Sequence, residues 1–383
     1  MITIIEKLLD QAGGHQKTQI KAIENLLTGE GLIILTARNS DVLLPTTYNI
    51  QRVLSSRKEQ RKSGAKAFHH DVAVLKNIFL GPNYLMGMRV LIPTAEKHEF
   101  LVCMKLLAKN ATRTGFVLRV LSHKIIEKLA DTERADLHSY IEAGSITLVT
   151  ETESLADLLQ TKYGLRAHNK FLLPCSIDPS DSVPQRGAGS RSHFKIGYLG
   201  VGRKEKGLAK LPTILAGLKT LLNASDTDVS LEIVMQTVKH KTMLRRLIFN
   251  YKLGRSLRNA SKPEQKISLT SLGEELPPEA FVAAIHSVDL LLIPYELKAY
   301  HARGSGIIID GVLAEKPIVY TDGIGMNEFL GFGNAAAAAD LAEFAPKIMT
   351  VVQNLEAYRA KTPLARKALR AQIQKSAEFL AGL

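Results

Sequence analysis

The chain has 383 residues, of which 45% are hydrophobic and 23% charged, and this size and balance indicate a globular protein with two domains. No apolar run approaches the ~18 residues that a membrane span needs, and the N-terminus lacks the basic segment of a signal peptide. Cys103 and Cys175 lie in or beside apolar runs, which argues against a disulfide framework and for a reducing compartment. We therefore expect a cytoplasmic protein.

The net charge of +13 is concentrated in two segments. Residues 52–66 carry six Lys or Arg and one Glu, and residues 237–266 carry nine Lys or Arg and one Glu. Such clusters indicate an anionic partner (phosphate groups, a membrane surface or nucleic acid), but a solvated basic face explains each of them equally well. Apolar residues at helical spacing within 241–251 are typical of a helix on an anionic membrane or of one packed on the core.

Apolar, strand-like runs alternate with helical patterns along the chain. In the first half we predict strands at 3–9, 31–37, 88–95, 116–121 and 145–152, with helices at 16–27, 98–108 and 154–163. In the second half we predict strands at 194–200, 230–236, 267–272, 289–295 and 317–322, a helix at 210–222 and helical structure from 340 onward. Unbroken apolar strands separated by helices indicate parallel sheets covered on both faces.

Residues 178–192 interrupt this alternation, because they are rich in Pro, Gly, Ser and Asp and lack apolar periodicity. This composition is typical of a linker between domains. The sequence therefore predicts an α/β protein of two doubly wound domains, residues 1–177 and 193–383, joined by a linker at 178–192. The last helix is free to pack back on the first domain.

Ligands of open α/β sheets bind outside the carboxyl ends of the strands, so the loops at these ends are the candidate sites. Gly13 and Gly14 follow the first strand and precede a helix, an arrangement that suits a ligand as well as a plain turn. The stretch GVGRKEKG at 200–207 has the spacing of neither a dinucleotide fingerprint nor a P-loop.

Glycine and positive charge still point to an anion at this loop. Gly200 and Gly202 let main-chain amides approach it, while Arg203 and Lys206 supply a guanidinium and an ammonium group. A solvated basic loop is the alternative. The strand-end position together with the glycines favours a phosphate site.

A third loop precedes the apolar helical pattern that starts at 307. Gly304, Ser305 and Gly306 at a helix start form an anion nest from main-chain N–H groups, to which Ser305 adds a hydroxyl. Asp310 lies about one turn into that helix, where a carboxylate can accept hydrogen bonds from sugar hydroxyls. An ordinary capped helix with one acid is the alternative interpretation.

Taken together, these residues resemble the motifs of family 4-like glycosyltransferases of the GT-B fold. The first match is the phosphate-loop pattern Gly-x-x-Arg-x-Glu-Lys-Gly, present as Gly200, Arg203, Glu205, Lys206 and Gly207. The second is the donor-binding segment, matched by Pro294, Tyr295, Tyr300, Arg303, Ser305, Gly306, Asp310, Lys316 and Pro317. Gly13 and Gly14 correspond to the family's N-domain glycine loop.

The resemblance implies two Rossmann-like domains facing a cleft and a hexosyltransferase-type enzyme. It would move a sugar from a UDP- or GDP-type nucleotide sugar to a glycan or lipid-linked acceptor, with retention, in bacterial polysaccharide or glycoconjugate synthesis. By similarity, Arg203 and Lys206 stabilise the diphosphate as it leaves, the amides of 304–306 hold a phosphate, and Asp310 binds the ribose. No metal or other cofactor is expected, since the sequence has no His/Cys cluster.

This chain departs from the family pattern at two acidic positions. The first is Ala302, and the second is Asp310 in place of glutamate. A catalytically weak nucleotide-sugar-binding protein of the same fold is therefore the second hypothesis. A nucleic-acid-binding protein is the third, motivated by charge alone and disfavoured by the absence of Trp and of a reader motif.

Three histidines of the first half are candidates for the acceptor side of the site: His15, His98 and His123. Each is near a predicted strand end or loop, although a lone His is more often structural or solvated. The basic segments 52–66 and 241–251 suit a protein that associates with the inner face of a membrane.

Overall fold

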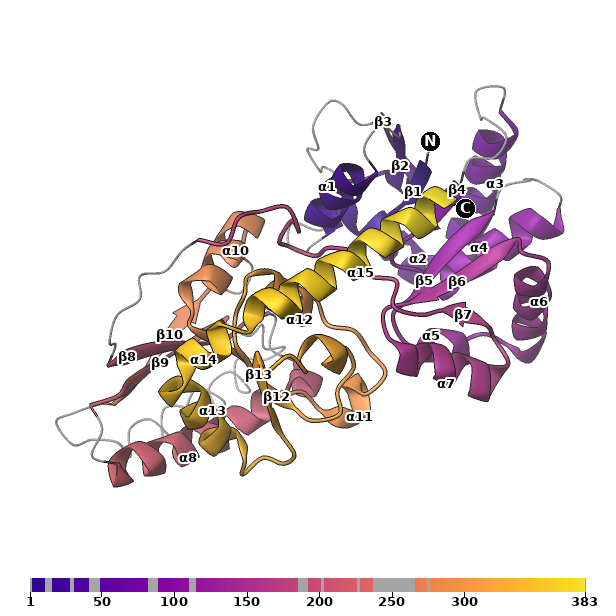
Figure 1. Cartoon of the computed structure of the whole chain (residues 1–383). Helices are drawn as coiled ribbons and strands as arrows, with labels where there is room; N and C mark the ends of the chain where they lie inside the picture. The colour runs from indigo at the N-terminus through magenta and orange to yellow at the C-terminus, as the bar shows by residue number, and fades with distance from the viewer. Residues whose placement is uncertain are drawn as a thin grey trace. The chain divides into compact units, whose positions relative to one another are not determined.

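The computed structural model describes residues 2–10, 16–27, 31–40, 49–81, 89–109, 115–184, 192–200, 203–225, 228–236, 266–273 and 276–382. The chain divides into two compact units (Figure 1). Unit 1 comprises Met1–Leu173, Ala302–Gly304 and Gln372–Leu383, and unit 2 comprises Pro174–His301 and Ser305–Ala371. The division at 173/174 precedes the linker expected at 178–192, and the end of the last helix belongs to unit 1.

Unit 1 is built on a sheet in which every strand pair is parallel. In the described residues the strand order is β3-β2-β1-β4-β5-β6-β7. The strands are β1 (Ile2–Ile5), β2 (Leu32–Ala37), β3 (Asn49–Leu54), β4 (Arg89–Ile92), β5 (Phe116–Val120), β6 (Ile146–Thr150) and β7 (Ala167–His168). The helices are α1 (Gln16–Leu26), α2 (Arg57–Lys62), α3 (Gly64–Leu80), α4 (Lys97–Ala108), α5 (Lys124–Glu127), α6 (Asp131–Glu142) and α7 (Glu153–Tyr163).

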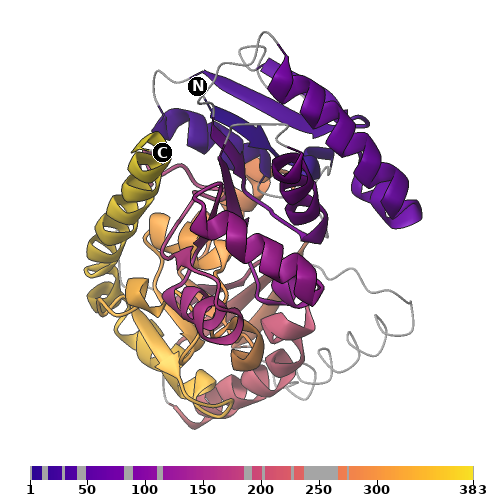
Figure 2. The ribbon, with the colours of Figure 1, turned by 90° about the vertical axis from the view of Figure 1, so that its right-hand side faces the viewer.

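Both faces of this sheet are buried, because successive residues of its strands enter different cores. On β4, Val90 and Ile92 join one apolar cluster with α3 and α4, whereas Leu91 joins the other. The second cluster contains residues of α1 and, from the end of α15 (Thr362–Gly382), Ala377 and Leu380. Figure 2 shows α3 and α4 side by side next to the strands. This two-sided burial explains why the central strands of the sheet are mostly apolar.

Unit 2 repeats the plan with a second all-parallel sheet. In the described residues its order is β10-β9-β8-β11-β12-β13. The strands are β8 (His193–Tyr198), β9 (Ser230–Gln236), β10 (Ile267–Leu272), β11 (Leu290–Ile293), β12 (Ile318–Thr321) and β13 (Ala335–Ala338). The helices are α8 (Leu211–Ala224), α10 (Pro278–Ser287), α11 (Leu297–Tyr300), α12 (Gly306–Leu313), α13 (Phe344–Gln353), α14 (Leu355–Arg359) and the first part of α15.

The prediction of two doubly wound parallel-sheet domains is confirmed. In each sheet the strand order reverses once, between β1 and β4 in unit 1 and between β8 and β11 in unit 2. At such a switch point the neighbouring loops leave toward opposite faces and open a crevice at the carboxyl edge. In the described residues, each sheet therefore has a switch point of the kind at which this class of fold binds ligands.

Several predicted elements were wrong in their limits. The first strand ends at Ile5, and residues Lys7–Asp10 form a 3-10 turn, so the strand expected at 3–9 is too long. Strands β3 and β13 were not predicted, because β3 is partly exposed and β13 is a run of alanines whose burial alternates. Helix α2 lies within the basic segment 52–66, and α3 begins there and continues to Leu80; neither helix was predicted.

Candidate functional site

The switch point of unit 2 lies between β8 and β11. Gly200 follows β8 with a φ of +88°, a conformation that glycine adopts without strain. A Cβ atom at this position would lie 2.8 Å from Nζ of Lys206, so the glycine also makes the room that the ammonium group occupies. The predicted neighbours Gly200 and Lys206 are thus brought together at the end of the strand.

Main-chain contacts hold the loop of Lys206 in place. The Tyr198 hydroxyl donates to the Lys206 carbonyl over 3.1 Å, and burial raises the pKa of Tyr198, so this hydroxyl keeps its proton. The Glu296 N–H donates to the Glu205 carbonyl over 2.9 Å. Gly207 has a φ of +76°, and a Cβ there would overlap the carbonyl of Pro294. The loop after β8, which resembles a phosphate-binding loop, therefore packs directly on the segment that follows β11.

Two tyrosine rings in contact lie beside the ammonium group of Lys206. The rings of Tyr295 and Tyr300 are 4.2 Å apart between centroids, and both residues are buried. Nζ of Lys206 lies 5.8 Å from the centre of the Tyr295 ring, within the range of a cation–π interaction. The Ser305 hydroxyl donates to the Tyr295 hydroxyl over 3.3 Å. Tyr295, Tyr300 and Ser305 thus form a packed group beside the Lys206 side chain.

Arg203 is the second cation at this edge. Its side chain is about half exposed, and its Nε lies 3.4 Å from Oε1 of Glu205. Glu205, for which the sequence suggests no role, is therefore the partner of Arg203. Because an exposed ion pair of this kind contributes little, the guanidinium can exchange it for an anionic ligand at small cost.

Asp310 lies about one turn into α12, as predicted, but its hydrogen-bond partners were not predicted. It is buried in α12, and its Oδ1 accepts hydrogen bonds from the N–H groups of Ser176 (2.8 Å) and Ile177 (3.0 Å). Burial raises the pKa of this carboxyl to about 6, although the two hydrogen bonds act in the opposite direction. One carboxylate oxygen is therefore committed to anchoring the main chain at 176–177. A ribose contact through the other oxygen stays a prediction.

The three residues of the expected anion nest, 304–306, belong to two different units: Gly304 to unit 1, and Ser305 and Gly306 to unit 2. The Ser305 N–H donates to Sδ of Met326 over 3.1 Å, and a Cβ on Gly306 would lie 3.0 Å from Sγ of Cys175. Arg303 and Gly304 belong to unit 1 instead, where a Cβ on Gly304 would overlap Glu151. The Ser305 N–H is therefore not directed at an open anion site.

Other predicted donor residues fall outside the described part of the chain. These are Gly13, Gly14 and Gly202, together with the candidate acceptor residue His15 and the basic segment 241–251. Their roles stay predictions.

Of the three candidate acceptor histidines, the structure describes His98 and His123, and each lies near a carboxylate. Nε2 of His98 is 2.8 Å from Oδ2 of Asp71, and Nε2 of His123 is 3.9 Å from Oε1 of Glu127. Burial alone would raise the pKa of Asp71, but hydrogen bonds from His98, Lys7 and Ser55 hold it well below its usual range. His98 thus belongs to a buried ionic network, and an acceptor contact by either histidine stays a prediction.

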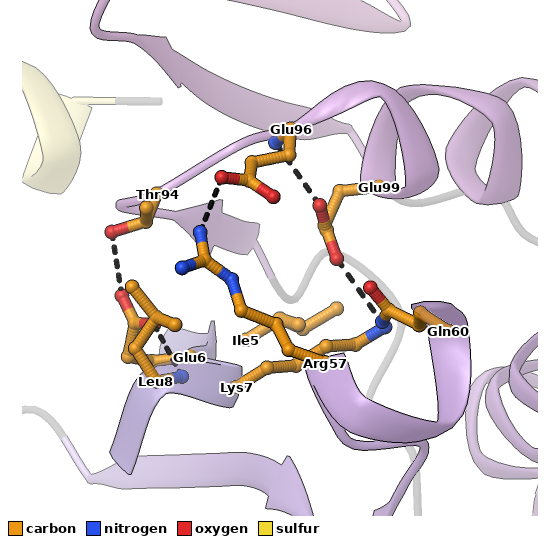
Figure 3. Close-up of a pocket in the computed structure, with 9 residues that line it drawn as sticks. All are labelled: Ile5, Glu6, Lys7, Leu8, Arg57, Gln60, Thr94, Glu96 and Glu99. Carbon is orange, nitrogen blue, oxygen red and sulfur yellow. Dashed lines mark hydrogen bonds and ion pairs between the residues drawn. The ribbon is translucent and has the colours of Figure 1, made fainter. Parts of the chain in front are cut away.

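The crevice of unit 1 contains residues that the sequence reasoning missed (Figure 3). It is a small hollow, with room for little more than a water molecule, at the switch point between β1 and β4. Its lining consists of Ile5, Glu6, Lys7, Leu8, Arg57, Gln60, Thr94, Glu96 and Glu99. Glu6 and Lys7 were hidden inside the strand predicted at 3–9. An acid and a lysine within an otherwise apolar run were the signals that could have revealed them.

The described parts of the chain contain no group of three or more His, Cys, Asp or Glu residues placed to hold a metal ion. In these same parts, no helix has the length and apolarity of a membrane span.

No model of a known family matches the chain, and no curated protein matches it in sequence. Solved structures match it over its whole length. The trehalose-6-phosphate synthase OtsA gives a TM-score of 0.71 at 12% identity, with 100% of this chain and 98% of that chain covered. WaaG, a glycosyltransferase involved in lipopolysaccharide biosynthesis, gives 0.63 at 15% identity with both chains fully covered. HepE of Anabaena, solved in complex with UDP and glucose, gives 0.65 at 14% identity, covering 100% and 99%.

At these identities the likeness establishes the fold. The chain has the GT-B fold, with two Rossmann-like parallel-sheet domains, as its motifs predict.

Proposed function

We propose that this protein is a glycosyltransferase that uses a nucleotide-sugar donor. The observation that carries the proposal is the group of residues after β8, where Lys206 lies beside the Tyr295 ring and Arg203 supplies a second, half-exposed cation. Glycosyl transfer from a nucleotide requires stabilisation of the departing diphosphate, and preorganised cations beside main-chain amides can supply it without a metal ion.

The finer points of the proposal come from the motif resemblance and from the structural neighbours. We propose a UDP- or GDP-type donor, transfer of a hexose with retention, and a glycan or lipid-linked acceptor in polysaccharide or glycoconjugate synthesis. HepE was solved with UDP and glucose, and another neighbour, the E. coli trehalose-6-phosphate protein, was solved with UDP-2-fluoro glucose. These ligands favour a nucleotide sugar for this chain too.

The test is Lys206→Ala. Loss of the ammonium group is expected to lower kcat for sugar transfer by about 10²–10³-fold, the cost of removing one donor to a developing oxyanion. Lys204→Ala is the matched control, since Lys204 lies in the same 3-10 turn and is exposed. Turnover of radiolabelled nucleotide sugar measures both variants. Full activity in Lys206→Ala, or equal losses in the two variants, would contradict the assignment.

A donor-binding protein without transfer is the second candidate. It is favoured by Ala302 and by Asp310, whose Oδ1 is already occupied by main-chain N–H groups. Calorimetry with a panel of UDP- and GDP-sugars, followed by a donor-hydrolysis assay, separates the two functions. Binding without hydrolysis or transfer would favour the second candidate.

We further propose peripheral association with the inner face of a cytoplasmic membrane. Helix α2 has no buried residue, and Lys58, Arg61, Lys62 and Lys66 are exposed on α2 and the start of α3. Glu59, the acid of this segment, pairs with Arg38 over 2.6 Å. An exposed row of lysines and arginines suits an anionic lipid surface.

A further inference from the structure

A basic hollow lies in unit 2 beside the first turns of α15. Four residues of α15 and one from the turn after α12 form its lining: Glu315, Pro363, Arg366, Lys367 and Arg370. All five belong to unit 2. The hollow has a volume of about 320 Å³. This volume is within the range of sites that bind small molecules, roughly 300–1,000 Å³.

The hollow and the loop of Lys206 lie at opposite edges of the same sheet. Glu315 precedes the first residue of β12, whereas Lys206 follows the last residue of β8. Because β8, β11 and β12 pair in parallel, these strands begin at one edge of the sheet and end at the other. The hollow is therefore separate from the residues that we assign to the sugar donor.

The cations of the hollow share one face of α15. Helix residues three, four and seven positions apart point to the same side, and Pro363 and the three cations have this spacing. Lys367 and Arg370 are exposed, and within the described part of the chain neither side chain has an ion pair or a hydrogen bond. Both charges are therefore available to a ligand.

Arg366, the third cation, is held in a fixed position. Its Nη1 lies 3.4 Å from Oε1 of Glu315, and its Nη2 donates to the Asp181 carbonyl. The Arg366 side chain is only 13% exposed. Because this guanidinium group is already ordered, a ligand that binds beside it does not have to immobilise it.

Glu315 holds Arg366 from a backbone conformation that favours glycine. Its φ is +53°, in the left-handed region, where a residue with a side chain is strained by about 1–2 kcal/mol. Glu315 is also the one acid of the lining, which carries three positive charges against this single negative charge. The net charge of +2 is matched by an anion of two negative charges.

We propose that this hollow binds a phosphate group, carried by a small molecule or by a lipid headgroup. Guanidinium groups offer a planar pair of donors that fits phosphate oxygens, and the ammonium group of Lys367 adds a third charge-assisted donor. The proposal does not depend on glycosyl transfer, because the lining contains neither Arg203 nor Lys206.

The test uses the full chain carrying Arg203→Ala and Lys206→Ala, so that the loop after β8 does not contribute to phosphate binding. Pyrophosphate is titrated into this protein by calorimetry in a phosphate-free buffer. Adding Arg370→Gln is expected to lower the affinity about tenfold or more, because a charge-assisted hydrogen bond is lost. Lys375→Gln is the matched control, since Lys375 is an exposed cation of the same helix outside the lining. Circular dichroism confirms that each variant is folded.

Glu315→Gln tests the charge balance of the lining. The substitution keeps the shape of the side chain and removes its negative charge, while the Asp181 carbonyl still holds Arg366. The affinity for pyrophosphate is therefore expected to rise several-fold. A fall in affinity would contradict the charge argument.

Sedimentation with phosphatidylcholine vesicles that contain phosphatidic acid distinguishes the two sources of the phosphate group. Pyrophosphate binding that Arg370→Gln weakens and Lys375→Gln does not supports a soluble ligand. Vesicle binding with the same dependence, in a protein that does not bind pyrophosphate, supports a lipid headgroup. Binding that is unchanged in Arg370→Gln in both assays, equal losses in the two variants, or no binding in either assay would overturn the proposal.

Discussion

The buried carboxyl of Glu6 makes the stability of unit 1 depend on pH. Burial raises the pKa of Glu6 from 4.5 to about 7, against the hydrogen bonds from Leu8 and Thr94 and the charge of Arg119, while Glu99 adds to the increase. Between these two pH values the folded state binds more protons at this site than the unfolded state. The free energy of unfolding therefore decreases as the pH rises from 4.5 to 7, and it levels off above 7.

The perturbation is Glu6→Gln, which keeps the shape of the side chain and removes the ionisation. A pKa raised from 4.5 to about 7 corresponds to about 3 kcal/mol. The variant is expected to lack this pH dependence. The difference between its free energy of unfolding and that of the wild type should therefore increase by about 3 kcal/mol between pH 4.5 and pH 8. For a unit of this size the gain corresponds to a Tm shift on the order of 6–12 °C.

Differential scanning calorimetry measures the stability of both proteins at pH 5 and pH 8. The effect is the change in stability of the wild type between these pH values minus the same change in Glu6→Gln. Asp310, whose pKa is raised to about 6 by burial, titrates in the same window but is present in both proteins. Glu142→Gln is the control, because its carboxyl is exposed. If the wild type and Glu6→Gln lose stability in parallel from pH 5 to pH 8, the reasoning from burial is refuted.

Three other substitutions test separate parts of the structure. Gly207→Ala places a side chain at a φ of +76° and against the carbonyl of Pro294, which strains the loop by at least about 1–2 kcal/mol. The affinity for a UDP-sugar, measured by calorimetry, should therefore fall about tenfold or more. Unchanged affinity would contradict the loop's role. Asp310→Ala leaves two main-chain N–H groups without their acceptor and should lower the free energy of unfolding in urea by about 1–3 kcal/mol. Unchanged stability with weakened donor binding would instead favour a ribose contact. Replacing Lys58, Arg61 and Lys62 together with Gln should weaken binding to phosphatidylglycerol vesicles by about 3 kcal/mol, roughly a hundredfold, at low salt. Sedimentation with phosphatidylcholine vesicles is the control, and equal binding of both proteins to anionic vesicles would exclude this surface.

The sequence predicted the two-sheet architecture because the signal is local. Buried parallel strands are mostly apolar, and β11 is apolar at every position; helices of the expected period separate these strands. The same locality revealed the loop after β8, in which glycines and cations are neighbours in sequence. Strands without such a signal were missed, among them β13, where four alanines form an edge partner of β12.

The chemistry of individual side chains depended on residues far away in the chain. Glu6 was hidden in an apolar run, and one of its hydrogen-bond donors, Thr94, lies 88 positions further along. The Asp310 carboxylate lies one turn into a helix, as expected, yet Oδ1 accepts from residues 134 and 133 positions earlier. No spacing rule encodes such partners.

The sequence by itself therefore determined the class of fold and the position of the loop at 200–207, which resembles a phosphate-binding loop, since both follow from periodicity and local composition. Only the tertiary structure decided which charges are neutralised and which carboxyl groups are buried. The physical reason is that pKa and ligand preference depend on burial and on neighbouring charges within a few ångströms, and these neighbours are set by how the strands order in the sheet.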